Sequence, residues 1–319
     1  MHNLPEMLLL DGTAMLFRAY FSKNKFQTPG GVEAGGAVLV AQRLQRILSR
    51  QRPDRVALLF DAGHRTFRHQ ITTDYKGQRE RPPDDLRPQF DLVRAIGVQL
   101  GFACFCVRGF EADDLMATLS RHAQSFGYRC RMQSADKDLY QLITDGKEAD
   151  GLRPARPPII QEIPRTRERI DALAVQQRTG VRPDQVVDYM SLVGDACDNI
   201  PGIRGVGPKT AAALMQHFDS LDNLYDNLDT VPELPIRGAR SVQRRLEAGR
   251  EDALQARKLV KLRDDVEVGI SPETIMKVTQ WSGPRGQSAD DLFRHLGFME
   301  PLYRLRQHAH WYFRRPVSA

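Results

Sequence analysis

The stretch that decides the fold is Gly109-Phe110-Glu111-Ala112-Asp113-Asp114-Leu115, where three carboxylates fall within four residues. It follows the short apolar run 102–107, which is typical of a buried strand. The apolar positions after it, Leu115, Met116 and Leu119, share one face of a helix. The acids therefore stand where a strand ends and a helix begins, the place where open α/β sheets bind ligands. The alternative is helix capping, which accounts for one or two of the three acids.

Acids also follow three other runs that predict strands. The runs 7–10, 55–60 and 128–133 end at Asp11, at Asp61, and at Asp136 with Asp138. If the strands are parallel, six or seven carboxylates meet at one edge of the sheet, where they repel one another unless cations neutralise them. Mg²⁺ suits such oxygen ligands. The sequence thus predicts an α/β fold with a metal centre at the edge of its sheet.

Composition sets broad limits on the function. A length of 319 residues allows two domains, and a net charge of +6 weakly favours a polyanionic partner. The four cysteines lack paired CxxC spacing, so we expect reduced core residues and a cytoplasmic protein. The longest apolar run near the N-terminus, 7–10, is too short for a signal peptide or a membrane span, so we expect no membrane association.

Residues 64–89 form a basic segment with interleaved aromatic residues. Its members include Arg68, Tyr75, Lys76, Arg79 and Arg81. One interpretation is a solvated loop; the other is a surface whose cations hold phosphates while its aromatic rings stack on bases. Residues 145–164 are rich in Pro and Arg and predict an interdomain connection, with mostly helical structure from 168 onwards.

A glycine-rich stretch in the second half predicts a hairpin between helices. Asp195 and Asp198 precede it and, three residues apart, would share one face of a helical turn. Pro208 suits the first turn of the next helix, whose free amides can bind a phosphate beside Lys209. The spacing differs from that of a nucleotide P-loop, and the alternative is a plain glycine-rich turn. Further on, 264–268 predicts a short extended segment and 290–307 one helix.

At this point the motifs resemble a known family, the 5′–3′ exonuclease/flap endonuclease family, and in particular the nuclease module at the N-terminus of bacterial DNA polymerase I. The matching stretches, in the family's order over residues 7 to about 270, are LLLDGTAMLFRAY, ALLFDAGHRTFRHQ, DYKGQR, GFEADDLMATL, SADKDLYQL, GDACDNIPGIRGVGPKTAAAL and RGARSVQRRLE. Because no polymerase region follows, we expect a stand-alone member with a PIN-like, mostly parallel sheet flanked by helices.

The resemblance implies two bound Mg²⁺ ions, for which Mn²⁺ would substitute. The residues that match the first site are Asp11, Asp61, Glu111 and Asp113, with Asp114 close by. Those that match the second are Asp136, Asp138, Asp195 and Asp198. Lys76 matches the lysine that approaches the scissile phosphate, and Arg68 and Arg18 match basic positions near it.

The resemblance also implies how DNA is held. Segment 64–89 matches an arch that admits a free 5′ strand, and the hairpin matches a helix-hairpin-helix that grips duplex DNA and commonly carries K⁺. The expected DNA contacts are Tyr75, Arg79, Arg81, Gly202, Gly205, Gly207, Lys209 and Thr210. The expected domains are an α/β nuclease domain at 1–165, a helix-hairpin-helix domain at 166–290 and a helical tail at 291–319.

The expected function is metal-dependent 5′–3′ exonuclease and flap-endonuclease cleavage of 5′-flap, nicked or 5′-ended duplex DNA, by a monomer, in DNA replication and repair. Two alternatives remain at this point: a non-catalytic protein of the same fold that binds DNA structures, and a PIN-like ribonuclease. A phosphatase that uses Asp11 as nucleophile is disfavoured, because Asp11-Gly12-Thr13 lacks the second aspartate two residues on.

Overall fold

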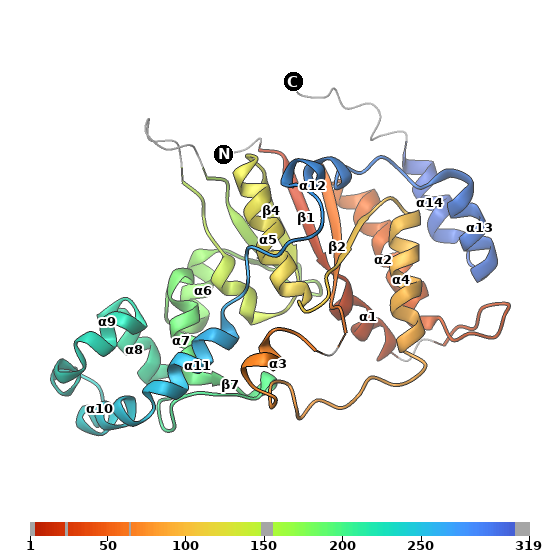
Figure 1. Ribbon diagram of the computed structural model, residues 1–319. Coiled ribbons are helices and arrows are strands. Elements are labelled where there is room, and N and C mark those ends of the chain that lie inside the picture. Colours follow the sequence, from red (N-terminus) through yellow and green to blue (C-terminus); the bar gives the residue numbers. More distant parts are fainter. Residues whose placement is uncertain (1–3, 23–24, 64, 148–155, 310–319) are drawn as a thin grey trace. The chain divides into compact units, whose positions relative to one another are not determined.

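The computed structural model describes residues 4–22, 25–63, 65–147 and 156–309 (Figure 1). The chain divides into two compact units, each assembled from separate segments of sequence. The first unit comprises residues up to 62, residues 81–134 and residues from 265 onwards. The second comprises residues 63–80 and 135–264.

The first unit contains the four predicted strands as a parallel sheet in the order β3-β2-β1-β4. Their bounds are Glu6–Asp11 for β1, Arg55–Phe60 for β2, Ala103–Cys106 for β3 and Arg129–Gln133 for β4. In this register Leu9 of β1 lies opposite Ala57 on one side and Met132 on the other. Strand β1 is buried along its whole length, as the continuous apolar run at 7–10 predicts for a central parallel strand.

Helices cover both faces of this sheet (Figure 1). Their bounds are Gly12–Tyr20 for α1, Gly35–Gln51 for α2, Arg87–Gln99 for α4, Ala112–Ser125 for α5, Pro272–Val278 for α12, Gly286–Leu296 for α13 and Glu300–Ala309 for α14. Leu8 and Leu10 of β1 pack into one core with Leu44 of α2 and Val93 of α4. Successive strand residues point to opposite faces, so Met7 and Leu9 are buried on the other face, where α5 lies.

One sequence prediction for the C-terminal part was wrong. Residues 290–307, predicted as one helix, belong to two helices, because Gly297 ends α13 with a left-handed φ of 76° before α14 begins. Residues 264–268 lie in no helix or strand, and the predicted extended segment there stays a prediction. No helix within the described ranges is long and apolar enough to cross a membrane.

The second unit is mainly helical. Its α-helices are α3 (Arg68–Ile71), α6 (Ala172–Thr179), α7 (Val186–Val193), α8 (Pro208–Phe218), α9 (Leu221–Asp226), α10 (Ala239–Ala248) and α11 (Arg250–Val260). Its 3₁₀ turns are η1 (Lys137–Leu142), η2 (Pro183–Gln185), η3 (Ala196–Asp198) and η4 (Leu228–Glu233). Two antiparallel strand pairs complete it: β5 (Ile159–Glu162) with β6 (Arg169–Ile170), and β7 (Gly194–Asp195) with β8 (Ile200–Pro201).

Strand β5 corrects the prediction that 145–164 is only a connection. The prolines at 157, 158 and 164 lie outside the strand, which they delimit. Within it, Ile159, Gln161 and Glu162 are buried, which a Pro/Arg-rich composition does not reveal. Residues 148–155 of the predicted connection lie outside the described residues. The expected domain boundaries near 165 and 290 stay predictions.

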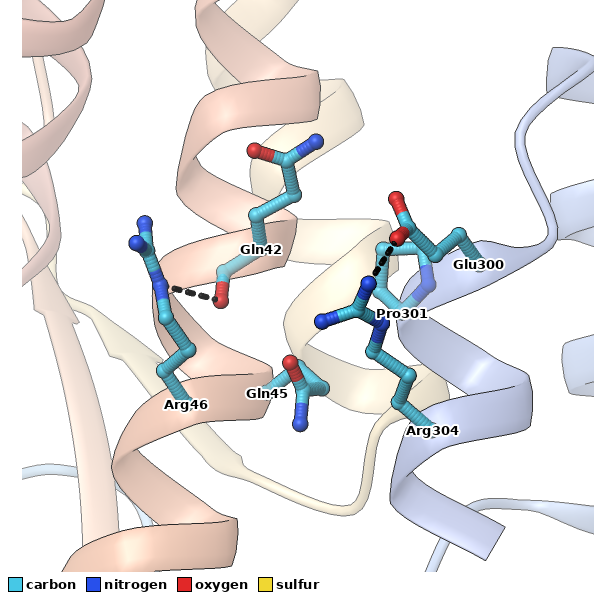
Figure 2. A pocket seen from close by; sticks show the side chains of 6 residues that line it. All are labelled: Gln42, Gln45, Arg46, Glu300, Pro301 and Arg304. Carbon is cyan, nitrogen blue, oxygen red and sulfur yellow. Dashed lines mark hydrogen bonds and ion pairs between the residues drawn. The ribbon is translucent and has the colours of Figure 1, made fainter. Parts of the chain in front are cut away.

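A shallow pocket of about 150 Å³ lies between α2 and α14 of the first unit (Figure 2). Gln42, Gln45 and Arg46 line it from α2, and Glu300, Pro301 and Arg304 from α14. Arg304 pairs with Glu300 at 2.5 Å, and Arg46 Nε donates to the backbone oxygen of Gln42 at 3.2 Å. The pocket contains none of the predicted site residues, so it is not the predicted metal centre.

Candidate metal centre

Asp11 ends strand β1 and caps helix α1. Its Oδ1 accepts a hydrogen bond from the backbone nitrogen of Ala14 at 2.8 Å, and its Oδ2 accepts one from Ser134 Oγ at 3.1 Å. The next residue is glycine because a Cβ at Gly12 would lie 2.6 Å from the ring of Phe60. The carboxylate is therefore fixed at the end of the sheet by backbone and hydroxyl donors.

Asp61 follows β2 and ties its end to the start of α5. Its Oδ1 accepts a hydrogen bond from the backbone nitrogen of Ala112 at 2.7 Å. Its own backbone nitrogen donates to Thr13 Oγ1 at 2.9 Å. The strand ends that carry Asp11 and Asp61 are thus held together through the first turns of two helices, as the parallel arrangement predicts.

The Glu111–Asp114 stretch contains a helix-capping residue as well as residues of the predicted metal site. Glu111 is the N-cap residue of α5, and the buried Asp114 accepts a hydrogen bond from the backbone nitrogen of Glu111 at 3.2 Å. Asp114 therefore closes the first turn of the helix, as the capping alternative expects. Asp113, in the same turn, is half-buried. We call Asp11, Asp61, Glu111 and Asp113 the first acidic set.

Asp195 and Asp198 lie in a tight hairpin formed by β7, η3 and β8. Asp195 is in the extended strand β7 and caps the 3₁₀ turn, its Oδ1 accepting from the backbone nitrogen of Cys197 at 3.0 Å. Asp198 closes that turn, and the left-handed φ of 56° at Asn199 reverses the chain. The two acids were predicted to share a helical face; they instead meet across a strand end and a 3₁₀ turn.

Glycine makes this hairpin possible. Gly194 has φ 78°, and a Cβ there would lie 2.3 Å from the backbone nitrogen of Gly202. A Cβ at Gly202 would lie 2.3 Å from the backbone oxygen of Val193. The two chains approach too closely for any side chain, which holds Asp195 and Asp198 in place.

Asp138 joins these two acids in a compact cluster. Carboxylate oxygens of Asp138, Asp195 and Asp198 lie within 4.8 Å of one another. Asp136 caps the adjacent turn η1, accepting from the backbone nitrogen of Asp138 at 2.9 Å, and its side chain is exposed. We call Asp136, Asp138, Asp195 and Asp198 the second acidic set.

The cluster fits a hard divalent cation. Asp138 Oδ1 is buried and has no hydrogen-bond partner among the described residues. Burial, followed by the neighbouring carboxylates of Asp136, Asp195 and Asp198, raises the pKa of Asp138 well above its ordinary value. A buried oxygen without a donor, beside two further carboxylates, is a donor set that Mg²⁺ prefers.

Cationic side chains from two segments pair with Asp195 and Asp198 of the second acidic set. Lys137 Nζ lies 3.0 Å from Asp195 Oδ1, and Lys76 Nζ lies 3.5 Å from Asp198 Oδ2. Arg79 also pairs with Asp198 through Oδ1. Lys137 was not among the predicted site residues, although its place between Asp136 and Asp138 was a usable signal.

Residues 74–79 dock onto the Asp198 turn. Tyr75 OH donates to Asp198 Oδ2 at 3.0 Å, and the backbone nitrogen of Lys76 donates to the backbone oxygen of Asp198 at 2.9 Å. Asn199 Nδ2 donates back to the oxygen of Asp74 at 2.8 Å. Lys76 has φ 54°, an uncommon backbone conformation for a residue with a side chain. Tyr75 is only 2% exposed, so its ring presents no face on which a base could stack.

The predicted arginines differ in accessibility. Arg68 is 1% exposed, its Nε donates to the backbone oxygen of Leu259 at 2.8 Å, and its guanidinium lies 4.5 Å from the ring centre of Phe67. Here Arg68 anchors the second unit; its predicted catalytic role stays a prediction. Arg18 and Arg81, both in the first unit, are exposed.

The glycine-rich stretch forms the predicted hairpin between α7 and α8. Gly207 is the N-cap residue of α8 and Pro208 is its first residue, as predicted. Lys209 is exposed and Thr210 half-buried in the same first turn. Gly205 has φ 81°, and its carbonyl oxygen accepts a hydrogen bond from Arg245 Nη1 at 2.8 Å.

The first unit has a parallel sheet whose strands end in acidic residues, and the second unit has a glycine-rich hairpin between helices. Two family models match: "5′-3′ exonuclease, N-terminal resolvase-like domain" at residues 6–179, and "5′-3′ exonuclease, C-terminal SAM fold" at residues 181–283. The chain belongs to the 5′-3′ exonuclease family, whose members are hydrolases that act on DNA.

Among curated relatives, DNA polymerase I of Pseudomonas aeruginosa is 35% identical over 294 residues, which are 92% of this chain and 30% of that protein. DNA polymerase I of Bacillus subtilis is 29% identical over 300 residues, 94% of this chain and 32% of that protein. The chain thus spans about a third of the length of these relatives.

Solved structures share the fold. T5 5′-exonuclease with bound zinc has a TM-score of 0.64 at 21% identity, with 94% of this chain and 99% of that chain covered. The catalytic core of Rad2 in complex with DNA substrate has a TM-score of 0.61 at 13% identity, with 97% and 93% covered. At these identities the likeness concerns the fold.

Proposed function

We propose that this protein is a divalent-metal-dependent 5′–3′ exonuclease and flap endonuclease that hydrolyses phosphodiester bonds of DNA at 5′ ends and flap junctions. The observation that carries the proposal is the cluster of Asp138, Asp195 and Asp198, whose oxygens lie within 4.8 Å of one another. Family membership supports the reaction class.

The two acidic sets would hold the metal ions. Backbone amides fix Asp11 and Asp61 of the first set, and the Ser134 hydroxyl also holds Asp11, which keeps both carboxylates in constant positions. Asp138 contributes the buried oxygen of the second set. When bound, the two divalent ions lower the pKa of a coordinated water and neutralise charge on the phosphate. We propose Mg²⁺, with Mn²⁺ as a substitute.

Lys76 is the side chain proposed to act on the phosphate. Its ammonium nitrogen lies 3.5 Å from Asp198 Oδ2. The backbone of Lys76 is strained, with φ 54°, and its nitrogen donates a hydrogen bond to the backbone oxygen of Asp198. Local strain of this kind is often found at functional sites. An ammonium group there stabilises negative charge that develops on the phosphate oxygens and on the leaving oxygen.

The hairpin and the basic residues of 64–89 are proposed to hold DNA through its phosphates. The first turn of α8 presents backbone amides next to the exposed Lys209, an arrangement suited to an anion. Phosphate contacts position a duplex without reading its sequence. Cleavage should therefore follow DNA structure, and affinity should fall steeply with salt.

The deciding experiment incubates the protein with a labelled 5′-flap duplex in Mg²⁺, in Mn²⁺ and in EDTA. We expect cleavage near the junction with either metal and none in EDTA. Cleavage in EDTA would contradict the metal role. Binding without cleavage in both metals would favour the non-catalytic alternative, and faster cleavage of an RNA flap than of the DNA flap would favour the ribonuclease alternative.

The remaining expectations complete the proposal. The protein would act as a monomer in the cytoplasm, in DNA replication and repair. The sequence also led to a K⁺ ion on the carbonyls of the hairpin. That ion is not part of the proposal, because a guanidinium already lies on the carbonyl of Gly205.

A further inference from the structure

The K⁺ expected at the helix-hairpin-helix does not fit the carbonyl group of Gly205. Arg245 Nη1 donates a hydrogen bond to this oxygen at 2.8 Å. The carbonyl oxygens of Ile203 and Gly207 also accept hydrogen bonds, from the backbone nitrogens of Val206 at 2.9 Å and Ala211 at 3.0 Å. A K⁺ on the Gly205 oxygen would lie beside a permanent positive charge, which repels it.

The guanidinium of Arg245 also packs closely against the backbone of Gly205. Gly205 has φ 81°, and a Cβ there would lie 2.5 Å from Arg245 Nη1 and 2.8 Å from Arg245 Cζ. Only glycine therefore permits both this backbone conformation and the close approach of Arg245.

Helix α10, which carries Arg245, is held against the hairpin at a second point. Gly249 follows the helix and is buried, and a Cβ there would lie 3.1 Å from the side chain of Ile203. Ile203 is in turn tied to the end of α7, because its backbone nitrogen donates to the Leu192 oxygen at 2.8 Å. The end of α10 thus lies against the same turn whose carbonyl Arg245 contacts.

We propose that Arg245 is a built-in cation of the hairpin, which takes the place of K⁺ and binds a DNA phosphate together with the first turn of α8. A guanidinium has five N–H donors, and the carbonyl of Gly205 uses one of them. The side chain is exposed, so the other donors can reach a phosphate. This inference rests on the proposed DNA-binding function.

The test measures the affinity for a fluorescent 5′-flap duplex by anisotropy, with Ca²⁺ in place of Mg²⁺, in KCl and in NaCl of equal ionic strength. For the wild-type protein we expect dissociation constants in the two salts that agree within about twofold. Arg245→Gln loses the charge, and its shorter side chain withdraws the donor that Nη1 supplies to the Gly205 carbonyl. We expect it to bind DNA more weakly, and several-fold more tightly in KCl than in NaCl, because carbonyl oxygens replace the hydration shell of K⁺ better.

Arg244→Gln is the matched control, since it removes the same charge from the neighbouring exposed position of α10. Its two dissociation constants should agree as in the wild type. A wild type that needs K⁺, or an Arg245→Gln variant with wild-type affinity in both salts, would overturn the inference.

A second readout needs no DNA. Thermal unfolding should show a K⁺-specific rise in the midpoint for Arg245→Gln and none for the wild type, because the vacated carbonyl can then accept the ion. Equal midpoints in the two salts for both proteins would count against the inference. If none of the proteins binds the flap in either salt, the proposed function fails, while the unfolding experiment still decides the cation.

Discussion

The two acidic sets are held in different ways. In the first unit, backbone amides and a hydroxyl hold Asp11 and Asp61. In the second unit, Lys137 holds Asp195, while Lys76, Arg79 and Tyr75 hold Asp198. Backbone donors are part of the fold and stay in place, whereas long cationic side chains can leave and exchange. The second set therefore adds cationic side chains at Asp195 and Asp198 to a backbone donor, since the backbone nitrogen of Cys197 also donates to Asp195.

The largest effect is expected from neutralising the first set. Asp113→Asn keeps the size of the side chain and removes its charge, so we expect the single-turnover cleavage rate to fall by about 10³-fold. The affinity for the flap in Ca²⁺ should stay near that of the wild type. Asp291→Asn, at an exposed acid that pairs with Arg294 in the same unit, is the control. If Asp113→Asn weakens binding but turns over normally at saturation, Asp113 is not a metal ligand.

Next in size is Lys76, a cationic partner of Asp198 in the second set. Lys76→Ala should lower the cleavage rate at saturating enzyme by about 10²-fold, because it removes a charge proposed to act on the phosphate. Lys209→Ala, in the hairpin, is expected to show the reverse pattern, with weaker binding and an unchanged saturated rate. Titrating enzyme against labelled flap separates the two quantities. If both variants lose binding and keep the saturated rate, Lys76 does not act on the cleavage step.

A smaller effect concerns stability against pH in metal-free protein. Burial and the carboxylates of Asp136, Asp195 and Asp198 raise the pKa of Asp138 well above its ordinary value of 3.8. The folded state thus binds the proton more tightly than the unfolded state, so the free energy of unfolding falls as pH rises from 3.8 through the raised pKa. Asp138→Asn should flatten this fall and be the more stable protein in EDTA at neutral pH.

Bound Mg²⁺ should reverse the order of stability of the wild type and Asp138→Asn. A wild type saturated at one hundred times its dissociation constant for Mg²⁺ gains ~2.7 kcal/mol, a gain that Asp138→Asn should largely lose. Urea unfolding in EDTA and in Mg²⁺ over a pH series measures both effects. Parallel pH curves for the two proteins in EDTA would show that Asp138 is not held in a repulsive cluster.

The smallest effect is expected at Asp114, which closes the first turn of α5 and was not included in the first set. Asp114 is buried and accepts from the backbone nitrogen of Glu111, so Asp114→Ala should cost about 1 kcal/mol of unfolding free energy through loss of the cap. Cleavage by the folded variant should stay within about tenfold of the wild type. Asp114→Asn, which keeps an acceptor, should recover part of the stability. A loss of cleavage as deep as that of Asp113→Asn would move Asp114 into the first set.

Much of this architecture could be read from sequence, because each signal is local. Continuous apolar runs predict buried strands, and the acids that end them need only parallel pairing to meet at one edge. The first turn of α8 was predictable for the same reason, since Pro208 and the preceding glycine act within one turn. Strand β5 was missed because its signal is four residues long and lies among prolines.

The side-chain roles depend on contacts that are distant in sequence. Tyr75 looks like a base-stacking residue in a basic segment, yet it is buried on the carboxylate of Asp198, 123 residues away. Arg68 looks like a phosphate-binding residue, yet its guanidinium is buried against the backbone of Leu259. Burial of an aromatic or a guanidinium is settled by which segments pack together, and spacing along the chain carries no record of that.

Sequence by itself determined the four strands, the acids at their ends, the helical hairpin and the family resemblance, because periodicity, turn chemistry and motif order are properties of neighbouring residues. The tertiary structure alone decided how each acid is held. It showed that Asp195 and Asp198 meet through close backbone contacts at Gly194 and Gly202, and that cationic side chains pair with both. It also placed Arg245 on the carbonyl of Gly205, 40 residues away in the chain. Those contacts follow from packing, since the electrostatic environment of a group is the sum of what the whole fold brings near it.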